Sequence, residues 1–249
     1  MEPVLLFFDR AFDFFLPGLD PGKAVACPIR KGASIKDIME SLGVPHTEVG
    51  QIVFKNGEID FSFIPVSGDE IHICSVVQPF DITQKTLLRP FPFDELKFIV
   101  DVNAGKLANI LLKLGFDVKF SNACTDSDIA DIAAAEKRVV LTRDTGLLKR
   151  KKIVYAKRVR ASDPWIQLSE VLNYFGLNSS DFKFLSRCSL CNAPLVDIEK
   201  KHIIHRLAPK TRKYYQFFKI CPVCRQIFWK GSHYGDMKTR LAEMGLNVS

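Results

Sequence analysis

Residues 96–120 read LKFIVDVNAGKLANILLKLGFDVKF, and this stretch decides the fold of the middle of the chain. The apolar run at 96–100 has the length of a buried strand, and residues 104–114 repeat apolar side chains at helical spacing, with Gly115 as a stop. Residues 116–120, FDVKF, are expected to form a second strand. A strand, a helix and a strand in this order predict a parallel βαβ unit.

The same alternation continues towards the C-terminus. It predicts a second helix at 127–137, a third strand at 139–142 and a fourth strand at 154–159. A last helix is expected at 164–175, because Asp163 suits its N-cap, Pro164 its first position and Gly176 its end. We therefore expect a small parallel α/β sheet with helices packed against it.

Aspartates follow the carboxyl ends of the predicted strands. Asp101 comes directly after the first strand and Asp144 after the third, while Asp126 lies where the second strand has crossed over to a helix. Side chains just past the carboxyl ends of parallel strands share one crevice. Carboxylates gathered there repel one another unless a cation lies among them, and Mg²⁺ or Mn²⁺ prefers such oxygen ligands. The sequence therefore predicts a divalent metal site.

Each acid also has a structural explanation. Asp126 is suited to cap the helix that begins at Ser127, and Asp128, three residues after Thr125, could complete a capping box. Asp163 is a fourth metal candidate, but it also suits an N-cap.

Asp101 and Asp144 are harder to explain in this way, because a charged side chain directly after a buried strand carries a desolvation cost unless it binds something. Asp117 and Asp131 are expected to be ordinary surface or turn residues.

The segment before the central sheet has short apolar runs separated by turns. Strands are expected at 4–8, 24–29, 51–55 and 70–77, and a small helix at about 34–42. Ser34 suits the N-cap of that helix, Gly43 its stop, and residues 55–58, KNGE, an Asn-Gly hairpin turn. This is the order of a β-grasp fold.

The sequences VFKNG at 53–57 and PVSGDEI at 65–71 make this segment similar to ubiquitin-like domains, in particular the sulfur carriers. Carrier chemistry resides in a terminal Gly-Gly carboxylate, whereas this segment runs on through SVVQPF at 75–80. We therefore expect a unit that docks a protein partner, with the prolines at 79, 90 and 92 marking a linker at 81–95.

Two Cys-x-x-Cys pairs near the C-terminus predict a metal-folded module. Cys188 and Cys191 form the first pair and Cys221 and Cys224 the second, with 29 residues between them. Four thiolates at this spacing are the ligands of a tetrahedral structural Zn²⁺ site, and we expect a zinc ribbon with a long hairpin arm. Disulfides are the alternative. Histidines 202 and 205 in the arm could ligate metal but are expected to be exposed basic residues.

The positive charge gathers in this tail. The chain carries a net charge of +7; residues 1–80 carry −5, residues 81–180 carry +4 and residues 181–249 carry +8. Basic and aromatic side chains alternate around Arg212, Lys213 and Tyr214, which suits a phosphate backbone with bases stacked beside it. A solvated surface is the alternative.

The cysteines and the apolar runs of the chain indicate its cellular compartment. Outside the two pairs, the chain has three cysteines, Cys27, Cys74 and Cys124, which are far apart in sequence. An odd number of scattered cysteines is expected in a compartment where thiols stay reduced. The apolar start of the chain is cut by Asp9, unlike a signal peptide, and no run of about 18 apolar residues occurs. We expect a cytoplasmic protein that does not enter a membrane.

An ordered series of motifs runs from the first strand to the tail: FIVD at 98–101, GKLA at 105–108, LGFDV at 114–118, Asp126, RVVLTRD at 138–144, QL at 167–168, RCSLCN at 187–192, CPVC at 221–224 and WKGSHY at 229–234. Over about residues 96–237 this series resembles the PIN-like ribonuclease domain of the Mut7-C family, which many bacterial members precede with a β-grasp domain. The resemblance implies that Asp101, Asp126 and Asp144 are catalytic, metal-binding acids, with Asp163 as a further cofactor-binding candidate, and that RNA is the substrate.

The residue patterns and the family resemblance together predict the organisation of the chain. It comprises an N-terminal ubiquitin-like β-grasp domain at 1–80, a linker at 81–95, a PIN-like parallel α/β nuclease domain at 96–180, and a zinc ribbon with a basic tail at 181–249. The expected reaction is hydrolysis of an RNA phosphodiester by water activated on Mg²⁺ or Mn²⁺.

Further residues are expected to contact RNA. Asn103 and Thr142 could orient water or phosphate, Arg143 could neutralise phosphate charge, and His233 could stack on a base with Trp229 and Tyr234. The basic run Lys149, Arg150, Lys151 and Lys152 lies just past Asp144 and could guide the strand.

Two other functions fit the sequence. One is a non-catalytic RNA-binding or ribosome-associated adaptor in which the acids are structural. The other is the toxin of a toxin-antitoxin pair, although two attached domains make this chain more elaborate than a bare toxin.

Overall fold

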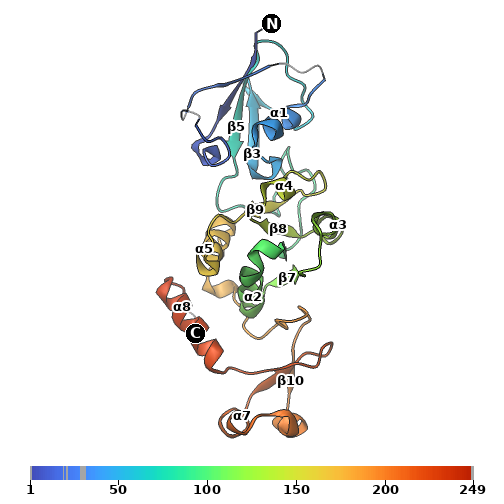
Figure 1. Ribbon diagram of the computed structural model, residues 1–249, viewed down its shortest axis with the longest axis vertical. Helices are drawn as coiled ribbons and strands as arrows, with labels where there is room; N and C mark the ends of the chain where they lie inside the picture. Colours follow the sequence, from blue (N-terminus) through green and yellow to red (C-terminus); the bar gives the residue numbers. More distant parts are fainter. Residues whose placement is uncertain (1, 19, 21, 29–31, 248–249) are drawn as a thin grey trace.

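The computed structural model describes residues 2–18, 20, 22–28 and 32–247. The molecule is elongated, with the N-terminal unit at one end, a parallel sheet in the middle and the cysteine-rich unit at the other end (Figure 1). The last helix returns from the cysteine-rich unit to lie beside the central one (Figure 1).

The N-terminal unit has the ubiquitin-like fold. Its strands are β1 (Val4–Phe8), β2 (Val25–Cys27), β3 (Val49–Phe54), β4 (Gly57–Glu58) and β5 (Glu70–Ser75), arranged in the order β2-β1-β5-β3-β4. β1 and β5 are parallel and the other pairs antiparallel. The expected β-grasp order is confirmed; Ile29, at the end of the strand expected at 24–29, lies outside the described residues.

Helix α1 (Ile35–Leu42) packs on this sheet through Ile35, Ile38 and Met39. It begins as expected, because the Ser34 hydroxyl accepts from the Asp37 N–H and the Asp37 carboxylate completes a capping box. The chain turns after β3 at Lys55 and Asn56, so the turn lies one residue earlier than the Asn-Gly pair suggested.

The central unit is a four-stranded sheet in which every pair is parallel, as predicted. The strands are β6 (Lys97–Val100), β7 (Asp117–Phe120), β8 (Val139–Thr142) and β9 (Ala156–Arg158), in the order β7-β6-β8-β9. The helices are α2 (Gly105–Leu114), α3 (Asp126–Glu136), α4 (Thr145–Leu148) and α5 (Pro164–Phe175), with short turns at η3 (Val102–Ala104) and η4 (Ser179–Asp181). One core joins α2 and α5 to one face of the sheet, and a second joins α3 and α4 to the other.

Two helix starts differ from the sequence-based expectation. Thr125, and not Asp126, is the N-cap of α3, and Asp128 completes its capping box. Asp144 caps the unexpected helix α4, where its carboxylate accepts from the Gly146 N–H. Both differences arise because short polar side chains satisfy whichever free N–H group the local turn presents.

The cysteine-rich unit contains an antiparallel sheet of β10 (Val196–Ile198), β11 (Phe218–Ile220) and β12 (Ile227–Phe228). The segment between β10 and β11 was expected to be a hairpin arm, but it folds into α6 (Lys200–Ile203), η5 (Ile204–Arg206) and α7 (Pro209–Tyr214). Ile203 and Leu207 of this insertion pack with the sheet, which explains why the segment is not extended.

Helix α8 (Ser232–Glu243) leaves the cysteine-rich unit and packs on the central one. Met237 and Leu241 are buried in the core shared by α2 and α5, and the Arg240 guanidinium lies 5.5 Å from the Trp165 ring centroid. The chain after residue 231 therefore contributes to the core of the domain that began at residue 96.

The turn η2 (His46–Glu48) joins the N-terminal unit to the central one. The His46 Nε2 lies 2.8 Å from the Ile153 carbonyl oxygen, and its Nδ1 lies 2.6 Å from Glu40 Oε1. The Arg158 N–H donates to Glu48 Oε1 at 3.0 Å. These groups are buried or half-buried, so the two units meet through a packed polar contact.

The segment at 81–95 is also packed. Arg89 is 2% exposed, and its guanidinium donates to the carbonyls of Val49 at 2.8 Å and Thr47 at 2.9 Å. Phe93 enters the core of the central unit, whereas Leu88 enters the core of the N-terminal one. This segment therefore holds the two units together.

Arg89→Met should loosen this junction, because two buried carbonyls lose their donors. We expect the free energy of unfolding to fall by about 2 kcal/mol and amide exchange at residues 46–49 to accelerate, both measurable by urea unfolding and hydrogen exchange. Arg10→Met, an exposed position, is the control, and equal behaviour of the two variants would contradict this role.

Asp117 is a structural anchor, contrary to the expectation of a surface residue. Its carboxylate pairs with Arg138 at 2.6 Å and Arg187 at 2.9 Å and accepts from the Asn192 side chain at 2.8 Å. Burial opposes ionisation, but the Asn192 hydrogen bond and the two arginines outweigh it, so the pKa of Asp117 lies below its ordinary value. Asp117 thus ties β7 to the first cysteine pair.

Asp117→Asn should lower the free energy of unfolding by about 1–3 kcal/mol at neutral pH. The lowered pKa means that this contribution is complete above the unfolded-state pKa, near 4, and disappears as pH falls through the folded-state pKa. The difference between parent and variant, measured by urea unfolding, should therefore vanish in acid. Asp131→Asn removes only an exposed pair with Lys152 and should have little effect at any pH.

Candidate metal and nucleic-acid sites

Asp101 lies at the carboxyl end of β6, next to β8. Its backbone N–H donates to the Leu141 carbonyl at 3.0 Å, which extends the strand pairing by one residue. The carboxylate is 5% exposed, and its Oδ2 accepts from the Thr142 hydroxyl at 2.7 Å and from the Asn103 side-chain amide. The side chain is held in one orientation.

Thr142 connects Asp101 to Asp144. Its buried hydroxyl donates to Asp101 and accepts from the Asp144 N–H at 2.9 Å. The Asn103 side-chain oxygen accepts from the Arg143 N–H at 3.0 Å, so the two loops that follow β6 and β8 are joined twice. The structure therefore brings Asp101 and Asp144 into one hydrogen-bonded network.

This donor set fits a hard divalent cation. In the described part of the chain, Asp101 has no ion-pair partner, and neither Asp101 Oδ1 nor Asp144 Oδ2 has a hydrogen-bond donor. Asp101 is buried, and a buried carboxylate without a cation is costly. Asp144 is exposed and caps α4 through Oδ1, so the expected desolvation cost applies to Asp101 alone. Carboxylate oxygens are the ligands that Mg²⁺ and Mn²⁺ prefer. Asp101 and Asp144 could hold such an ion.

Asp126 and Asp163 have other uses. Asp126 pairs with Arg150 at 3.4 Å, with both side chains 43% exposed. Asp163 caps α5 as expected, accepting from the N–H groups of Trp165 and Ile166 at 2.8 and 3.1 Å. Among the residues that the structure describes, the four acids do not form a compact group of metal ligands; the four cysteines do.

A cavity of about 440 Å³ adjoins the network. Asn103 and Lys106 line one side, and Ser162 and Gln167 line the other. Helix α2 begins here, and although the Gly105 N–H already donates to the Val102 carbonyl, the positive end of the helix dipole and the Lys106 ammonium favour an anion. The cavity is therefore suited to phosphate oxygens.

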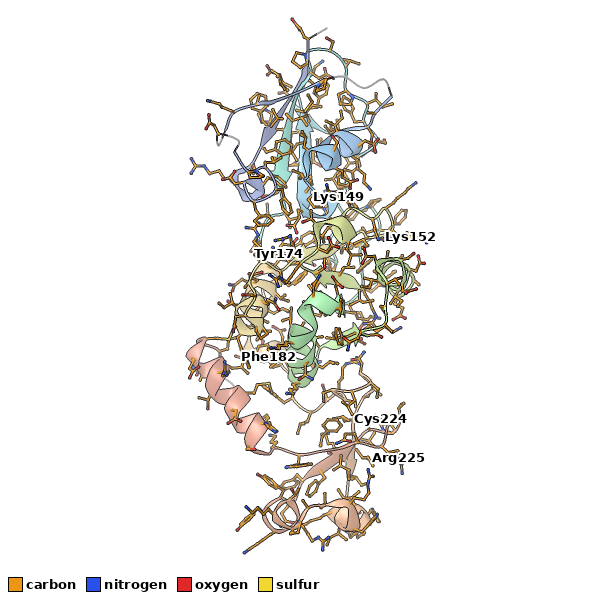
Figure 2. All side chains as sticks on the ribbon, in the orientation of Figure 1. Lys149, Lys152, Tyr174, Phe182, Cys224 and Arg225 are labelled. Carbon is orange, nitrogen blue, oxygen red and sulfur yellow. The ribbon has the colours of Figure 1, made fainter. Side chains whose placement is uncertain are left out.

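Most of the basic run after Asp144 already has partners. Lys149 donates to the Glu40 carbonyl at 2.7 Å, at the boundary with the N-terminal unit (Figure 2). Arg150 pairs with Asp126, and Lys152 with Asp131. Lys151 is exposed and has no partner within the described ranges. Lys149 therefore supports the domain contact, a use that sequence spacing did not suggest.

Apart from Arg143, the other residues expected to contact RNA lie on the surface of the cysteine-rich unit and α8. Arg212, Lys213 and Tyr214 belong to α7, where Tyr214 is 68% exposed and Lys213 lies 5.3 Å from its ring centroid. His233 is exposed in the first turn of α8. Arg143 is exposed beside Asp144.

The four cysteine sulfurs converge as the spacing predicted. All four lie within 4.8 Å of one another, with Cys188 and Cys224 separated by 3.5 Å and Cys191 and Cys221 by 3.4 Å. Zinc–sulfur bonds of about 2.3 Å in a tetrahedron require sulfurs about 3.8 Å apart. Cys224 lies at the end of the unit nearest the central sheet (Figure 2). The group can hold a structural metal such as zinc.

The thiols differ in their readiness to ionise. Burial raises the pKa of Cys188 to about 12. Burial acts in the same direction on Cys221, but the Cys224 N–H and the neighbouring thiols outweigh it and lower the pKa to about 6. Metal binding must therefore displace protons from this group.

Two further features of the structure gave little or no signal in the sequence. Lys106 and Lys113 lie on the exposed face of α2, and the only signal for them was their seven-residue spacing on one helical face. Asp117 gave no signal, because its three partners lie at least 21 positions away.

Comparison with known proteins gave two matches. The family model described as Mut7-C RNAse domain matches residues 96–241, and that described as Mut7-C ubiquitin matches residues 1–81. No curated protein and no solved structure matched the chain. None of the described helices has the length and apolar character needed to traverse a bilayer.

The cysteine group should bind one Zn²⁺ per chain, measurable by elemental analysis of the purified protein. Cys221→Ser should abolish binding and disorder β10–β12, because this small unit has little buried area to hold it without metal. Acidification should release the ion as protons compete for the thiolates. Cys124→Ser, which alters a thiol outside the group, should retain full zinc content; equal zinc in both variants would contradict the assignment.

Proposed function

This chain belongs to the Mut7-C RNase family, and we propose that it is a metal-dependent ribonuclease that hydrolyses phosphodiester bonds in RNA. The observation that carries the proposal is the Asp101–Thr142–Asp144 network, which presents unpartnered carboxylate oxygens beside a cavity suited to phosphate.

In this proposal Asp101 and Asp144 hold Mg²⁺ or Mn²⁺, and Asp126 joins them. A bound ion would activate water and neutralise charge on the phosphate. Thr142 and Asn103 keep the Asp101 carboxylate in place, and the start of α2 with Lys106 holds a phosphate. Asp126 must leave Arg150 to take part, which costs little because an exposed ion pair contributes about 0–1 kcal/mol.

RNA would also contact the cysteine-rich unit. We propose that zinc is its structural metal and that Arg212, Lys213, Tyr214 and His233 contribute to binding, in line with the net charge of +8 over residues 181–249. Lys151, and Arg150 once released, would add contacts near the acids.

The proposal also covers the domain boundaries, the compartment and the protein partner. We divide the chain at 1–80, 81–95, 96–180 and 181–249, with α8 packed on the central unit. We place the protein in the cytoplasm, where the free thiols Cys27, Cys74 and Cys124 would stay reduced. A protein partner on the β-grasp unit would bind away from η2, which the central unit already covers.

A non-catalytic RNA-binding adaptor is the second candidate. It is favoured by one observation: Asp126, Asp144 and Asp163 already have structural partners. In an adaptor, replacing Asp101 and Asp144 would leave RNA binding intact and there would be no cleavage to lose.

The test is cleavage of mixed structured and single-stranded RNAs by the full chain, with Mn²⁺, with Mg²⁺ or with neither. Omission of the ion is better than a chelator, which would also remove zinc. We expect cleavage only with added metal and a loss of roughly 100-fold or more in Asp101→Asn and Asp144→Asn. Thr142→Val should lose about 10–100-fold, because Thr142 positions Asp101 and the Asp144 backbone without holding the metal itself.

The matched control is Asp131→Asn, a surface acid that should leave the rate unchanged. Folding and zinc content of each variant are measured alongside. Absence of cleavage under every condition, with RNA binding retained, would favour the adaptor.

A further inference from the structure

We propose that the cavity between α2, the zinc ribbon and α8 binds an unstacked base of single-stranded RNA, and that the exposed face of α2 leads the strand from it to Asp101. This inference rests on the proposed ribonuclease function and describes how the substrate is held. The cavity lies at the C-terminal end of α2, whereas Asp101 lies just before its N-terminal end.

The cavity is assembled from segments that are distant in sequence. Its volume is about 370 Å³, within the range of about 300–1,000 Å³ that is usual for ligand sites. Lys113 at the end of α2 lies on its rim, the segment at 184–189 and strand β12 form two walls, and α8 closes it. Its aromatic lining consists of Phe184, Phe228, Trp229 and Tyr234.

The lining combines rings with cations. The Tyr234 ring packs edge-on against Phe184 at 5.2 Å, and Lys230 and Lys238 lie 5.2 and 5.9 Å from its centroid. A side chain at Gly231 would come within 2.8 Å of the Trp229 indole nitrogen, so glycine allows the chain to turn tightly beside that ring. Aromatic side chains that stack on bases, with cations for the phosphates, are the chemistry of single-strand binding.

Charge selects a polyanion over an apolar peptide as the occupant. The cysteine-rich segment at 181–249 carries a net charge of +8. On the rim, Arg187 is paired with Asp117, whereas Lys113 is exposed and forms no ion pair with any residue that the structure describes. Lys113 is therefore available to a phosphate next to a base in the cavity.

The exposed face of α2 connects this cavity to the acids. Lys106, Asn109 and Lys113 recur at three- and four-residue spacing on α2 and are all exposed, and the exposed Asn103 precedes them in η3. Lys106 lines the cavity beside Asp101 and Lys113 lines the aromatic one, and the lower end of α2 points towards the ribbon (Figure 1). Ten helical residues span about 15 Å. Four or five stacked nucleotides, at about 3.4 Å each, would cover this distance.

Tryptophan fluorescence gives a direct test. The chain has 2 tryptophans, so Trp165→Phe leaves Trp229, which lines the cavity, as the single reporter. We expect an eight-nucleotide oligouridylate, added without Mg²⁺ or Mn²⁺, to quench this fluorescence saturably. A dinucleotide, too short to reach along α2, should bind at least about tenfold more weakly.

Variants in this background separate stacking from charge. Tyr234→Leu should weaken binding about tenfold while Tyr234→Phe retains it, because only the ring is needed for stacking. Lys113→Ala should reduce the slope of log affinity against log salt by about 0.7, the loss of one phosphate contact with a single strand. Lys85→Ala, which removes an exposed charge from the segment at 81–95, should leave affinity and slope unchanged.

Absence of quenching, or Lys113→Ala behaving as Lys85→Ala does, would overturn the proposal; a cavity that receives a protein segment would give this result. Metal-dependent cleavage is measured separately, so the two proposals can fail independently. Quenching that depends on Tyr234 and Lys113 supports the base site even in a chain that does not cleave, and cleavage without quenching supports the nuclease alone.

Discussion

The parallel pairing of β6 with β7 on one side and β8 on the other is the constraint on which the rest of the structure depends. The register places Val100 opposite Leu141, so the next residue, Asp101, lies beside Thr142. Phe98 and Val100 face one core and Ile99 the other. A slip of one residue would exchange the two faces and separate Asp101 from Thr142.

The two edges of this sheet have different roles. The carboxyl edge carries the acids and the cavity suited to phosphate, as the geometry of open parallel sheets favours. The amino edge carries Asp117, which pairs with Arg138 inside the domain and with Arg187 before the first cysteine pair. A partly buried carboxylate with two arginines needs all its partners, so the cysteine-rich unit cannot move away without cost.

Helix α2 runs between the two edges because it crosses from the end of β6 to the start of β7. Its buried face belongs to the main core, which leaves a polar face for solvent or ligand. The same packing brings α8 back from the ribbon, since Met237 and Leu241 fill the core beside α2 and α5. The proposed RNA path therefore follows from core packing rather than from a separate binding domain.

The sequence by itself determined the β-grasp order, the parallel α/β unit, the converging cysteines and the caps at Ser34 and Asp163, because these depend on local spacing and turn chemistry. Only the tertiary structure decided that Asp117 anchors the ribbon and that Lys149 supports the domain contact. Their partners lie 21 to 109 positions away. Local periodicity records which face of an element is buried, whereas these pairings depend on how whole elements pack.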